Sequence, residues 1–216
     1  MPVRVLLVED HAIVRQGIRV AIERLADIQV VGEAENGRTA LKLVRECVPD
    51  VVLMDVLMPD MNGIDATRAI VAEFPESRVL IFSGQCDTRM ILGALKAGAK
   101  GFIMKSCGSI EELVTAIETV AFGKTFFCQQ VTECIVSDYM NLRDPEIRSI
   151  FSLISPRERE ILQMLAEGKN TKEIAYVLEL SPKTVDTHRK HIMSKLKVCS
   201  VAELTKFAIG EGLTSL

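Results

Sequence analysis

Four short apolar runs in this chain each end on a polar side chain, and this repeated pattern constrains the fold more than any other feature. The runs are VRVLLV before Glu9 and Asp10, VVLM before Asp55, RVLIF before Ser83, and GFIM before Lys105. Short apolar runs rich in β-branched residues are typical of buried strands. If the strands are parallel, their carboxyl ends meet at one edge of a sheet, and these polar side chains share one pocket.

Residues 3–121 alternate between such runs and longer stretches with helical period. The predicted strands cover 3–8, 29–34, 51–55, 78–83 and 101–105. The predicted helices cover 12–26, 37–48, 63–74, 87–97 and 109–121. Five consecutive βα units predict an α/β doubly wound parallel sheet of five strands, with helices on both faces and right-handed crossovers.

The remainder of the chain is predicted to be helical. We interpret 122–152 as a linker with one helix at 129–141, because it shows no strand–helix alternation. Residues 153–216 have the pattern of a small all-α domain, with predicted helices at 156–167, 171–178, 182–197 and 200–209. Ser155-Pro156 and Ser181-Pro182 each have the form of an N-cap followed by proline. The predicted domains are therefore 1–121 and 153–216.

Composition and charge agree with two globular domains that have different partners. The 216 residues are 48% hydrophobic, enough to bury a core. Residues 1–121 carry 13 Lys/Arg and 17 Asp/Glu, whereas residues 151–216 carry 10 and 8. The front of the chain is therefore acidic and the end is basic, and a basic domain is suited to a polyanion.

Cysteines and hydropathy predict a cytoplasmic protein without a membrane segment. The six cysteines form no C-x-x-C pair, so we expect incidental or buried thiols in a reducing compartment. No signal peptide is recognisable, and no apolar run approaches the ~20 residues that a membrane helix needs.

The pocket at the strand ends is suited to phosphoryl chemistry. Clustered carboxylates repel one another unless a cation joins them, and hard oxygen ligands favour Mg²⁺, with Mn²⁺ as a substitute. Asp55 would be the nucleophile that forms an aspartyl phosphate, and Lys105 would hold a phosphoryl oxygen. The Ser83 hydroxyl could bond another oxygen, while Gly84 leaves room for the group. One carboxylate in a loop would indicate nothing, whereas matched polar residues at the ends of four strands indicate a shared site.

The stretches VLLVEDH, VVLMDVLMPDMNG, LIFSG and GFIMKS resemble a CheY-like receiver domain of two-component response regulators, over residues 1–121. The resemblance implies a flavodoxin-like fold with strand order 2-1-3-4-5, an order known from the fold type. It also implies that Asp55 is the phosphoacceptor. The metal would be bound by Asp10, Asp55 and the backbone carbonyl of Leu57, with Glu9 acting through water.

The same resemblance implies a switch. Ser83 and Phe102 match the family's switch pair, and Lys105 matches its invariant lysine. Phosphorylation would add roughly −1.5 to −2 charge at Asp55. Ser83 would move toward that charge and Phe102 would fill the space, shifting the face built from the fourth helix, fifth strand and fifth helix. The alternative for Phe102 is ordinary core packing.

The pattern of the basic C-terminal domain predicts a helix-turn-helix whose second helix, 182–197, contacts DNA. Its apolar stripe is Val185, His188, Ile192 and Leu196, and its opposite face shows Lys183, Thr187, Lys190 and Ser194. Five Lys/Arg and one acid lie between 182 and 197. Such a face is suited to the major groove, with Ser181 and Thr184 at a phosphate and His191 at the backbone. The alternative is a solvated amphipathic helix.

The segment SPREREILQMLAEGKNTKEIAYVLELSPKTVDTHRKHIMSKLKV resembles the LuxR-type helix-turn-helix of the NarL/FixJ subfamily, over about residues 153–210. Asp186 stands where the family usually has lysine. A carboxylate there repels phosphate but accepts from a cytosine amino group. The last helix resembles the family's dimer contact, which implies a homodimer on an inverted-repeat site and contacts through Val201, Leu204, Thr205 and Ala208.

We therefore expect a response regulator that a sensor histidine kinase phosphorylates on Asp55, and that binds double-stranded DNA once the receiver domain ceases to inhibit the output domain. It would be no enzyme beyond its own phosphorylation and dephosphorylation. One alternative is a haloacid-dehalogenase-type phosphatase, although those carry D-x-D after the first strand and a cap domain. The other is a phosphorylation-independent DNA-binding protein with a vestigial pocket.

Overall fold

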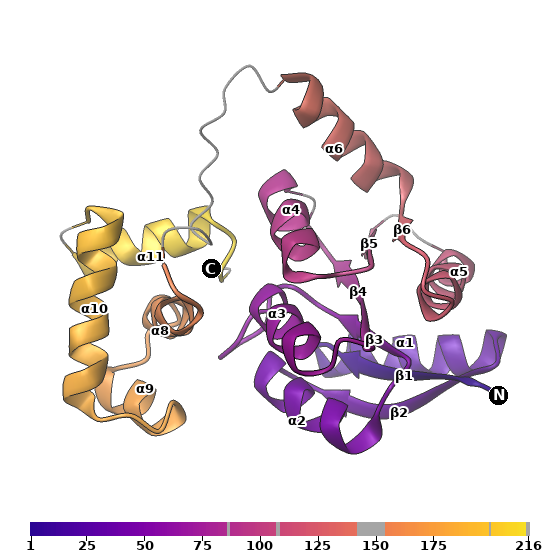
Figure 1. Cartoon of the computed structure of the whole chain (residues 1–216), viewed down its shortest axis with the longest axis horizontal. Coiled ribbons are helices and arrows are strands. Elements are labelled where there is room, and N and C mark those ends of the chain that lie inside the picture. The colour runs from indigo at the N-terminus through magenta and orange to yellow at the C-terminus, as the bar shows by residue number, and fades with distance from the viewer. Residues whose placement is uncertain (86, 107–108, 142–153, 199, 215–216) are drawn as a thin grey trace. The chain divides into compact units, whose positions relative to one another are not determined.

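The computed structural model describes residues 1–216 except 86, 107–108, 142–153, 199 and 215–216, and gives only the backbone of 138–141 (Figure 1). The chain divides into two compact units, Met1–Pro145 and Glu146–Leu216. No helix in the described part of the chain is long and apolar enough to cross a membrane. Cys47, Cys128 and Cys134 are free thiols, and the other three cysteines lie outside the described residues.

The first unit is a parallel sheet in the order β2-β1-β3-β4-β5-β6. The strands are β1 (Val3–Val8), β2 (Ile28–Ala34), β3 (Val51–Met54), β4 (Arg78–Ser83), β5 (Gly101–Met104) and β6 (Phe126–Phe127). The order of the first five is the predicted one. β3 and β5 are buried along their whole length, which explains their unbroken apolar sequences.

Five helices cover the sheet, and each lies within one or two residues of its prediction. They are α1 (Ala12–Leu25), α2 (Gly37–Cys47), α3 (Gly63–Glu73), α4 (Thr88–Ala97) and α5 (Ile110–Ala121). α1 contacts α5, whereas α2, α3 and α4 contact one another in sequence. Asn36, Asn62 and Ser109 cap α2, α3 and α5 by accepting from the backbone N–H three residues on.

β6 and α6 (Gln129–Asn141) extend the first unit into the stretch predicted to be a linker. β6 pairs in parallel with β5, and α6 contacts α4 and β5. Val131 of α6 is fully buried, and the Thr88 hydroxyl lies 3.2 Å from the Cys134 thiol. The helix at 129–141 was predicted, but the strand before it was not. The rest of that stretch, 142–152, lies outside the described residues.

The second unit consists of α8 (Pro156–Ala166), α9 (Thr171–Val177), α10 (Pro182–Leu196) and α11 (Val201–Gly210). These match the four predicted helices. Ser155 and Asn170 each form a capping box with a glutamate three residues on, and Ser181 caps α10 by accepting from the Thr184 N–H. Ile161, Ile174, Val185, Ile192 and Leu204 are among the residues of a single core.

An ion pair ties α10 to the start of α8. Lys195 Nζ lies 2.9 and 2.7 Å from the two carboxylate oxygens of Glu158, which also accepts from the Ser155 N–H. Glu158 is 4% exposed. Burial would raise the pKa of Glu158, but Lys195 and Ser155 outweigh burial and lower it. The contribution to stability is therefore present above the ordinary carboxylate pKa and is lost as pH falls through the lowered value.

Lys195→Ala should destabilise the second unit by about 1–2 kcal/mol at neutral pH, because it leaves a buried carboxylate without its cation. Hydrogen exchange of the α8 amides in the full chain measures this. Lys190→Ala on the same helix is the control, because the described residues give Lys190 no ion pair. Equal protection of α8 in both variants would contradict the expectation.

Candidate functional site

The strand register brings the predicted pocket residues to one edge of the sheet. Val8 of β1 pairs with Met54 of β3, so the residues that follow both strands are neighbours. The Asp55 N–H donates to the Val8 carbonyl at 2.9 Å. On the other side of the pocket, the Lys105 N–H donates to the Ser83 carbonyl at 2.7 Å, which joins the ends of β5 and β4.

Lys105 lies between two carboxylates. Its Nζ donates to Glu9 Oε2 at 2.6 Å and to Asp55 Oδ2 at 2.7 Å. The exposed fractions of the side chains are 1% for Glu9, 6% for Asp55 and 23% for Lys105. The ammonium also lies 5.6 Å from the centre of the Phe82 ring. Lys105 was predicted to hold a phosphoryl oxygen, and its pairing with Glu9 was not predicted.

Burial raises the pKa of Asp55, because the Lys105 ammonium offsets only part of the desolvation of the carboxylate and Glu9 adds repulsion. Burial alone would lower the pKa of Lys105, but Asp55 and Glu9 outweigh it and the pKa is raised. The Lys105 ammonium therefore stays charged, whereas the negative charge on the buried Asp55 carboxylate remains unfavourable. A further cation beside Asp55, or a bond from Asp55 to an electrophile, would relieve this unfavourable charge.

The backbone around Asp55 is packed so closely that only glycine fits beside it. Asp55 Oδ1 accepts from the Val56 N–H at 2.7 Å. The Gly63 N–H, at the start of α3, donates to the Val56 carbonyl at 2.8 Å. A Cβ on Gly63 would lie 1.9 Å from the Asp55 carbonyl oxygen. Gly63 therefore sets how near α3 comes to the residue that carries the chemistry.

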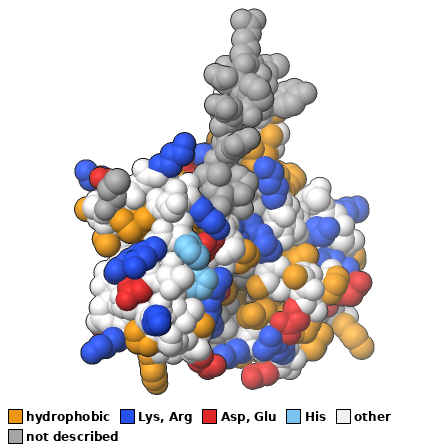
Figure 2. All heavy atoms as spheres, turned by 60° about the vertical axis from the view of Figure 1, so that its left-hand side comes forward, with side chains coloured by type: hydrophobic (Ala, Val, Ile, Leu, Met, Phe, Trp, Pro, Cys, Tyr) orange, Lys and Arg blue, Asp and Glu red, His pale blue; other side chains and the backbone are white. Residues whose placement is uncertain are grey.

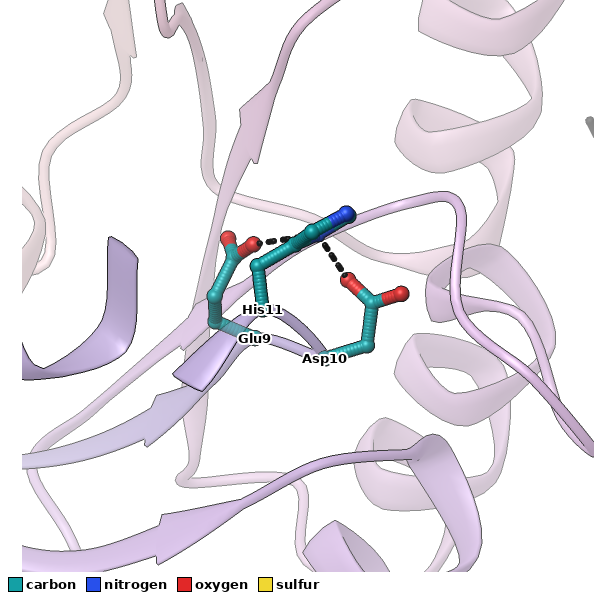
Figure 3. A group of neighbouring side chains, drawn as sticks. All are labelled: Glu9, Asp10 and His11. Carbon is teal, nitrogen blue, oxygen red and sulfur yellow. Dashed lines mark hydrogen bonds and ion pairs between the residues drawn. The ribbon is translucent and has the colours of Figure 1, made fainter. Parts of the chain in front are cut away.

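Glu9, Asp10 and His11 form a second cluster at the end of β1 (Figure 3). His11 Nδ1 lies 2.7 Å from Asp10 Oδ1 and 3.2 Å from Glu9 Oε1. The Asp10 carboxylate raises the pKa of His11. Asp10 Oδ1 is buried, and among the described residues its side-chain partner is His11.

This arrangement fits a hard divalent cation. A buried carboxylate oxygen that faces an exposed histidine, beside a second carboxylate, is the kind of donor that Mg²⁺ takes. Glu9 links the two clusters, since its Oε1 faces His11 and its Oε2 contacts Lys105. His11 was not foreseen. Its position next to the acidic pair in VLLVEDH was the signal that could have identified it.

The other predicted pocket residues lie nearby in different environments. The Ser83 side chain is buried, and its hydroxyl accepts from the Gln85 N–H at 3.2 Å. Phe102 is fully buried on β5. Gly84 is exposed, with no atom within 4 Å of the position of a Cβ. Leu57 is half-buried. The Ser83 hydroxyl therefore contacts its own loop.

α10 carries the predicted DNA face. Lys183, Thr187, Lys190, His191 and Ser194 are exposed, whereas Val185, Ile192 and Leu196 are buried. Figure 2 shows Lys and Arg side chains spread over this side of the molecule, with histidine among them. A cavity of about 350 Å³ lies over the start of the helix. It is lined by Ser181, Lys183, Thr184, Thr187, His188 and His191.

Two residues of α10 differ from the simple picture of an apolar stripe and a polar face. His188, predicted to lie in the core, is only partly buried, and its Nδ1 has no hydrogen-bond partner among the described residues. Asp186 Oδ1 lies 3.2 Å from Arg189 Nη2 and accepts from the Thr171 hydroxyl at 3.5 Å. The Asp186 carboxylate is thus engaged within the unit.

The four residues predicted for the dimer contact divide into two pairs. Leu204 and Ala208 are fully buried in the core of the second unit. A side chain without exposed surface cannot contact a second copy unless the domain rearranges. Val201 is 43% exposed and Thr205 is partly exposed. We therefore restrict the proposed contact to Val201 and Thr205.

Comparison with known proteins matches both halves of the chain. Residues 5–118 match the response regulator receiver domain, and residues 152–208 match the luxR family of bacterial regulatory proteins. The transcriptional regulatory protein MctR of Rhizobium johnstonii is 36% identical over 214 residues, covering 99% of this chain and 96% of MctR.

Solved structures give the same result. A LuxR-family two-component response regulator from Aurantimonas sp. SI85-9A1 is 38% identical with a TM-score of 0.62, covering 65% of this chain and 99% of that one. A structure of two RcsB dimers bound to two parallel DNAs is 27% identical with a TM-score of 0.58, covering 96% of this chain and 98% of RcsB.

Proposed function

This chain belongs to the response regulators that join a receiver domain to a LuxR-type DNA-binding domain, and we propose that phosphorylation of Asp55 controls its binding to DNA. The observation that supports this most directly is the Lys105 ammonium, 2.7 Å from a buried Asp55 carboxylate and 2.6 Å from Glu9. A sensor histidine kinase supplies the phosphoryl group, and a second copy of the chain binds beside the first on double-stranded DNA.

In the transfer step, a carboxylate oxygen of Asp55 attacks phosphorus, while the bond to the donor's leaving nitrogen or oxygen breaks in line. The Val56 N–H holds Oδ1, which orients the carboxylate. Lys105 moves from Asp55 Oδ2 to a phosphoryl oxygen and keeps its contact with Glu9. The space around Gly84 admits the group, and the Ser83 hydroxyl turns from its loop toward it.

Asp10, Asp55 and the Leu57 carbonyl would hold Mg²⁺, with Glu9 acting through water. When bound, the ion neutralises charge that builds up on the phosphoryl oxygens. Asp10 would contribute Oδ1, the oxygen that faces His11 in this structure. His11 is exposed enough to turn away from Asp10 as the cation arrives.

The output step is a release of the second unit. We infer that the unphosphorylated receiver blocks the α10 face, and that the shift of Ser83 and Phe102 weakens that block. α6 is suited to carry the change toward the linker, because it contacts α4 and β5 and its Cys134 lies against Thr88, the first residue of α4.

Two measurements on the intact chain test this proposal. Incubation with acetyl phosphate and Mg²⁺ should add the mass of one phosphoryl group, labile in base, at Asp55. DNA selected from random sequences should bind more tightly after that treatment. An unmodified Asp55, or equal affinity with and without the donor, would favour a vestigial pocket. Turnover of a small phosphoester that survives Asp55→Ala would favour an enzyme that does not use Asp55 as its nucleophile.

Leu57→Asn should shorten the lifetime of the aspartyl phosphate. Leu57 flanks the path of the hydrolytic water and offers no side-chain hydrogen bond, so the water is poorly oriented. An amide in its place should speed loss of the group by about tenfold, less than the roughly 10²-fold or more that a positioned general base contributes. Decay of the phosphorylated full chain, followed by mass, measures it, with Leu57→Met as the apolar control. Equal decay of both variants would contradict the expectation.

Lys190→Ala should weaken DNA binding across sequences. Lys190 is exposed on α10, so it is placed to neutralise a phosphate and release its counterion. The slope of log affinity against log salt should fall by about 0.9, the value for one phosphate contact. Lys206→Ala, an exposed lysine on α11, is the control and should leave the slope unchanged. An unaltered slope for Lys190→Ala would exclude Lys190 from the interface.

A further inference from the structure

One α1 side chain is tied to the connection that carries both acids of the pocket. Arg15 Nη1 donates to the Glu9 backbone carbonyl at 2.6 Å. Its Nε lies 3.2 Å from Glu33 Oε2, on β2. Arg15 is 18% exposed. A side chain of α1 therefore bridges the neighbouring strand and the point where β1 ends.

The backbone of Glu9 is held from two sides. Its N–H donates to the Ala34 carbonyl at 3.0 Å, which continues the pairing of β1 with β2. Its carbonyl accepts from Arg15, at the first peptide group beyond the strand. Glu9 is 1% exposed, so its carbonyl is a buried acceptor that water replaces poorly. This carbonyl belongs to the peptide group from which Asp10 continues.

We propose that Arg15 is a positioning residue for the cation site, an inference that rests on the function proposed above. By holding the Glu9 carbonyl, Arg15 fixes the direction in which Glu9 and Asp10 leave β1. The two carboxylates then present their oxygens together, rather than spreading apart under mutual repulsion. Arg15 does not touch the phosphoryl group or Asp55, so it acts on cation affinity and not on the transfer step.

Arg15 also has an electrostatic effect on Mg²⁺ affinity, and this effect opposes its positioning effect. A guanidinium near the pocket repels a cation, and its removal would then tighten Mg²⁺ binding. Glu33 neutralises that charge, because its Oε2 lies on Arg15 Nε, while Arg19, on its other oxygen at 2.7 Å, is balanced by its own ion pair with Glu23. The directed hydrogen bond to a buried carbonyl should therefore outweigh the repulsion.

Arg19 is the matched control for this inference. Arg15 and Arg19 both lie on α1 and both pair with Glu33, yet only Arg15 bonds to the Glu9 carbonyl. Arg15→Gln and Arg19→Gln each remove one positive charge from Glu33, and Arg19→Gln also removes it from Glu23. A difference between them in Mg²⁺ binding isolates the hold on the Glu9 carbonyl.

Calorimetric titration of the full chain with Mg²⁺ is the primary measurement. Arg15→Gln should raise the Mg²⁺ dissociation constant by about tenfold, the lower end for losing a residue that supports a metal ligand. Arg19→Gln should leave it unchanged, and Arg15→Lys should recover part of the affinity. With acetyl phosphate, half-saturating Mg²⁺ should rise in Arg15→Gln while the maximal rate at saturating Mg²⁺ stays within about twofold.

Equal dissociation constants for Arg15→Gln and Arg19→Gln would overturn the inference, as would tighter binding by Arg15→Gln. A fall in maximal rate at saturating Mg²⁺ with unchanged affinity would also overturn it. If Arg15→Gln does not fold, Arg15→Lys decides, since wild-type affinity in that variant contradicts a role for the paired guanidinium contacts. Failure of the wild-type chain to bind Mg²⁺ or accept a phosphoryl group would instead count against the proposed function itself.

Discussion

Asp55→Asn should abolish the phosphoryl adduct and leave DNA affinity unchanged by a phosphodonor. An amide in place of the carboxylate cannot form the acyl phosphate, although it keeps the shape of the side chain and can still accept from Lys105. The adduct should fall below the detection limit of intact-mass measurement, and this is the largest effect expected for any of the variants. The same variant tests both halves of the proposal, because adduct and DNA response should disappear together.

The same substitution should raise thermal stability in Mg²⁺-free buffer. Burial raises the pKa of Asp55, so the folded state favours the protonated form. For an acid with a raised folded pKa, the charged form costs stability at neutral pH, and the cost disappears as pH falls below the ordinary value. Asp55→Asn removes that cost, so its melting temperature should exceed that of the wild type at pH 7 by a margin that narrows on acidification.

Asp27→Asn is the control for this experiment, because Asp27 is exposed and the described residues give its side chain no partner. It should keep both the adduct and the wild-type melting temperature. An adduct that persists in Asp55→Asn would move the phosphoacceptor elsewhere. A donor-dependent rise in DNA affinity without an adduct would separate DNA binding from this pocket.

Gly63→Ala should destabilise the first unit by about 3 kcal/mol or more and impair phosphorylation. The added Cβ would lie 1.9 Å from the Asp55 carbonyl oxygen and 3.0 Å from Met54 Cγ. Backbone cannot yield as a flexible side chain does, so α3 must move away from β3 and lose the hydrogen bond from Gly63 to Val56. Urea unfolding of the full chain measures the loss, and adduct formation measures the displacement of Asp55.

Gly17→Ala provides a control of opposite sign. Gly17 lies within α1, and a Cβ there meets nothing within 4 Å. Alanine should therefore stabilise the unit by about 0.5–1 kcal/mol through helix propensity. If Gly63→Ala proved as stable as the wild type, α3 would not be packed against the phosphoacceptor as closely as this structure has it.

The candidate pocket was predictable because it depends on few assumptions. Runs such as VVLM and GFIM predict buried strands, and parallel pairing brings the residues after them to one edge. Asp55 and Lys105 could be named from that alone. Their partners could not, because whether Lys105 reaches Glu9 as well as Asp55 depends on side-chain directions that strand periodicity does not encode.

Other misses have equally local causes. β6 is only Phe126–Phe127, too short for any alternation to be recognised, and it forms only because β5 offers an unpaired edge. Leu204 and Ala208 share a helical face with Val201 and Thr205 in sequence terms. Only packing against α8 decides that the first two are buried within the domain.

The sequence by itself determined the helices, the five main strands, the Ser155 and Ser181 caps and the chemical types at the strand ends, because each depends on periodicity or on neighbours within a few residues. Tertiary structure alone decided that Arg15 holds the Glu9 carbonyl, that His11 lies against Asp10, and that Gly63 leaves no space beside Asp55. These contacts depend on how separate elements pack, and packing distances of a few tenths of an ångström are properties of the whole fold rather than of any segment.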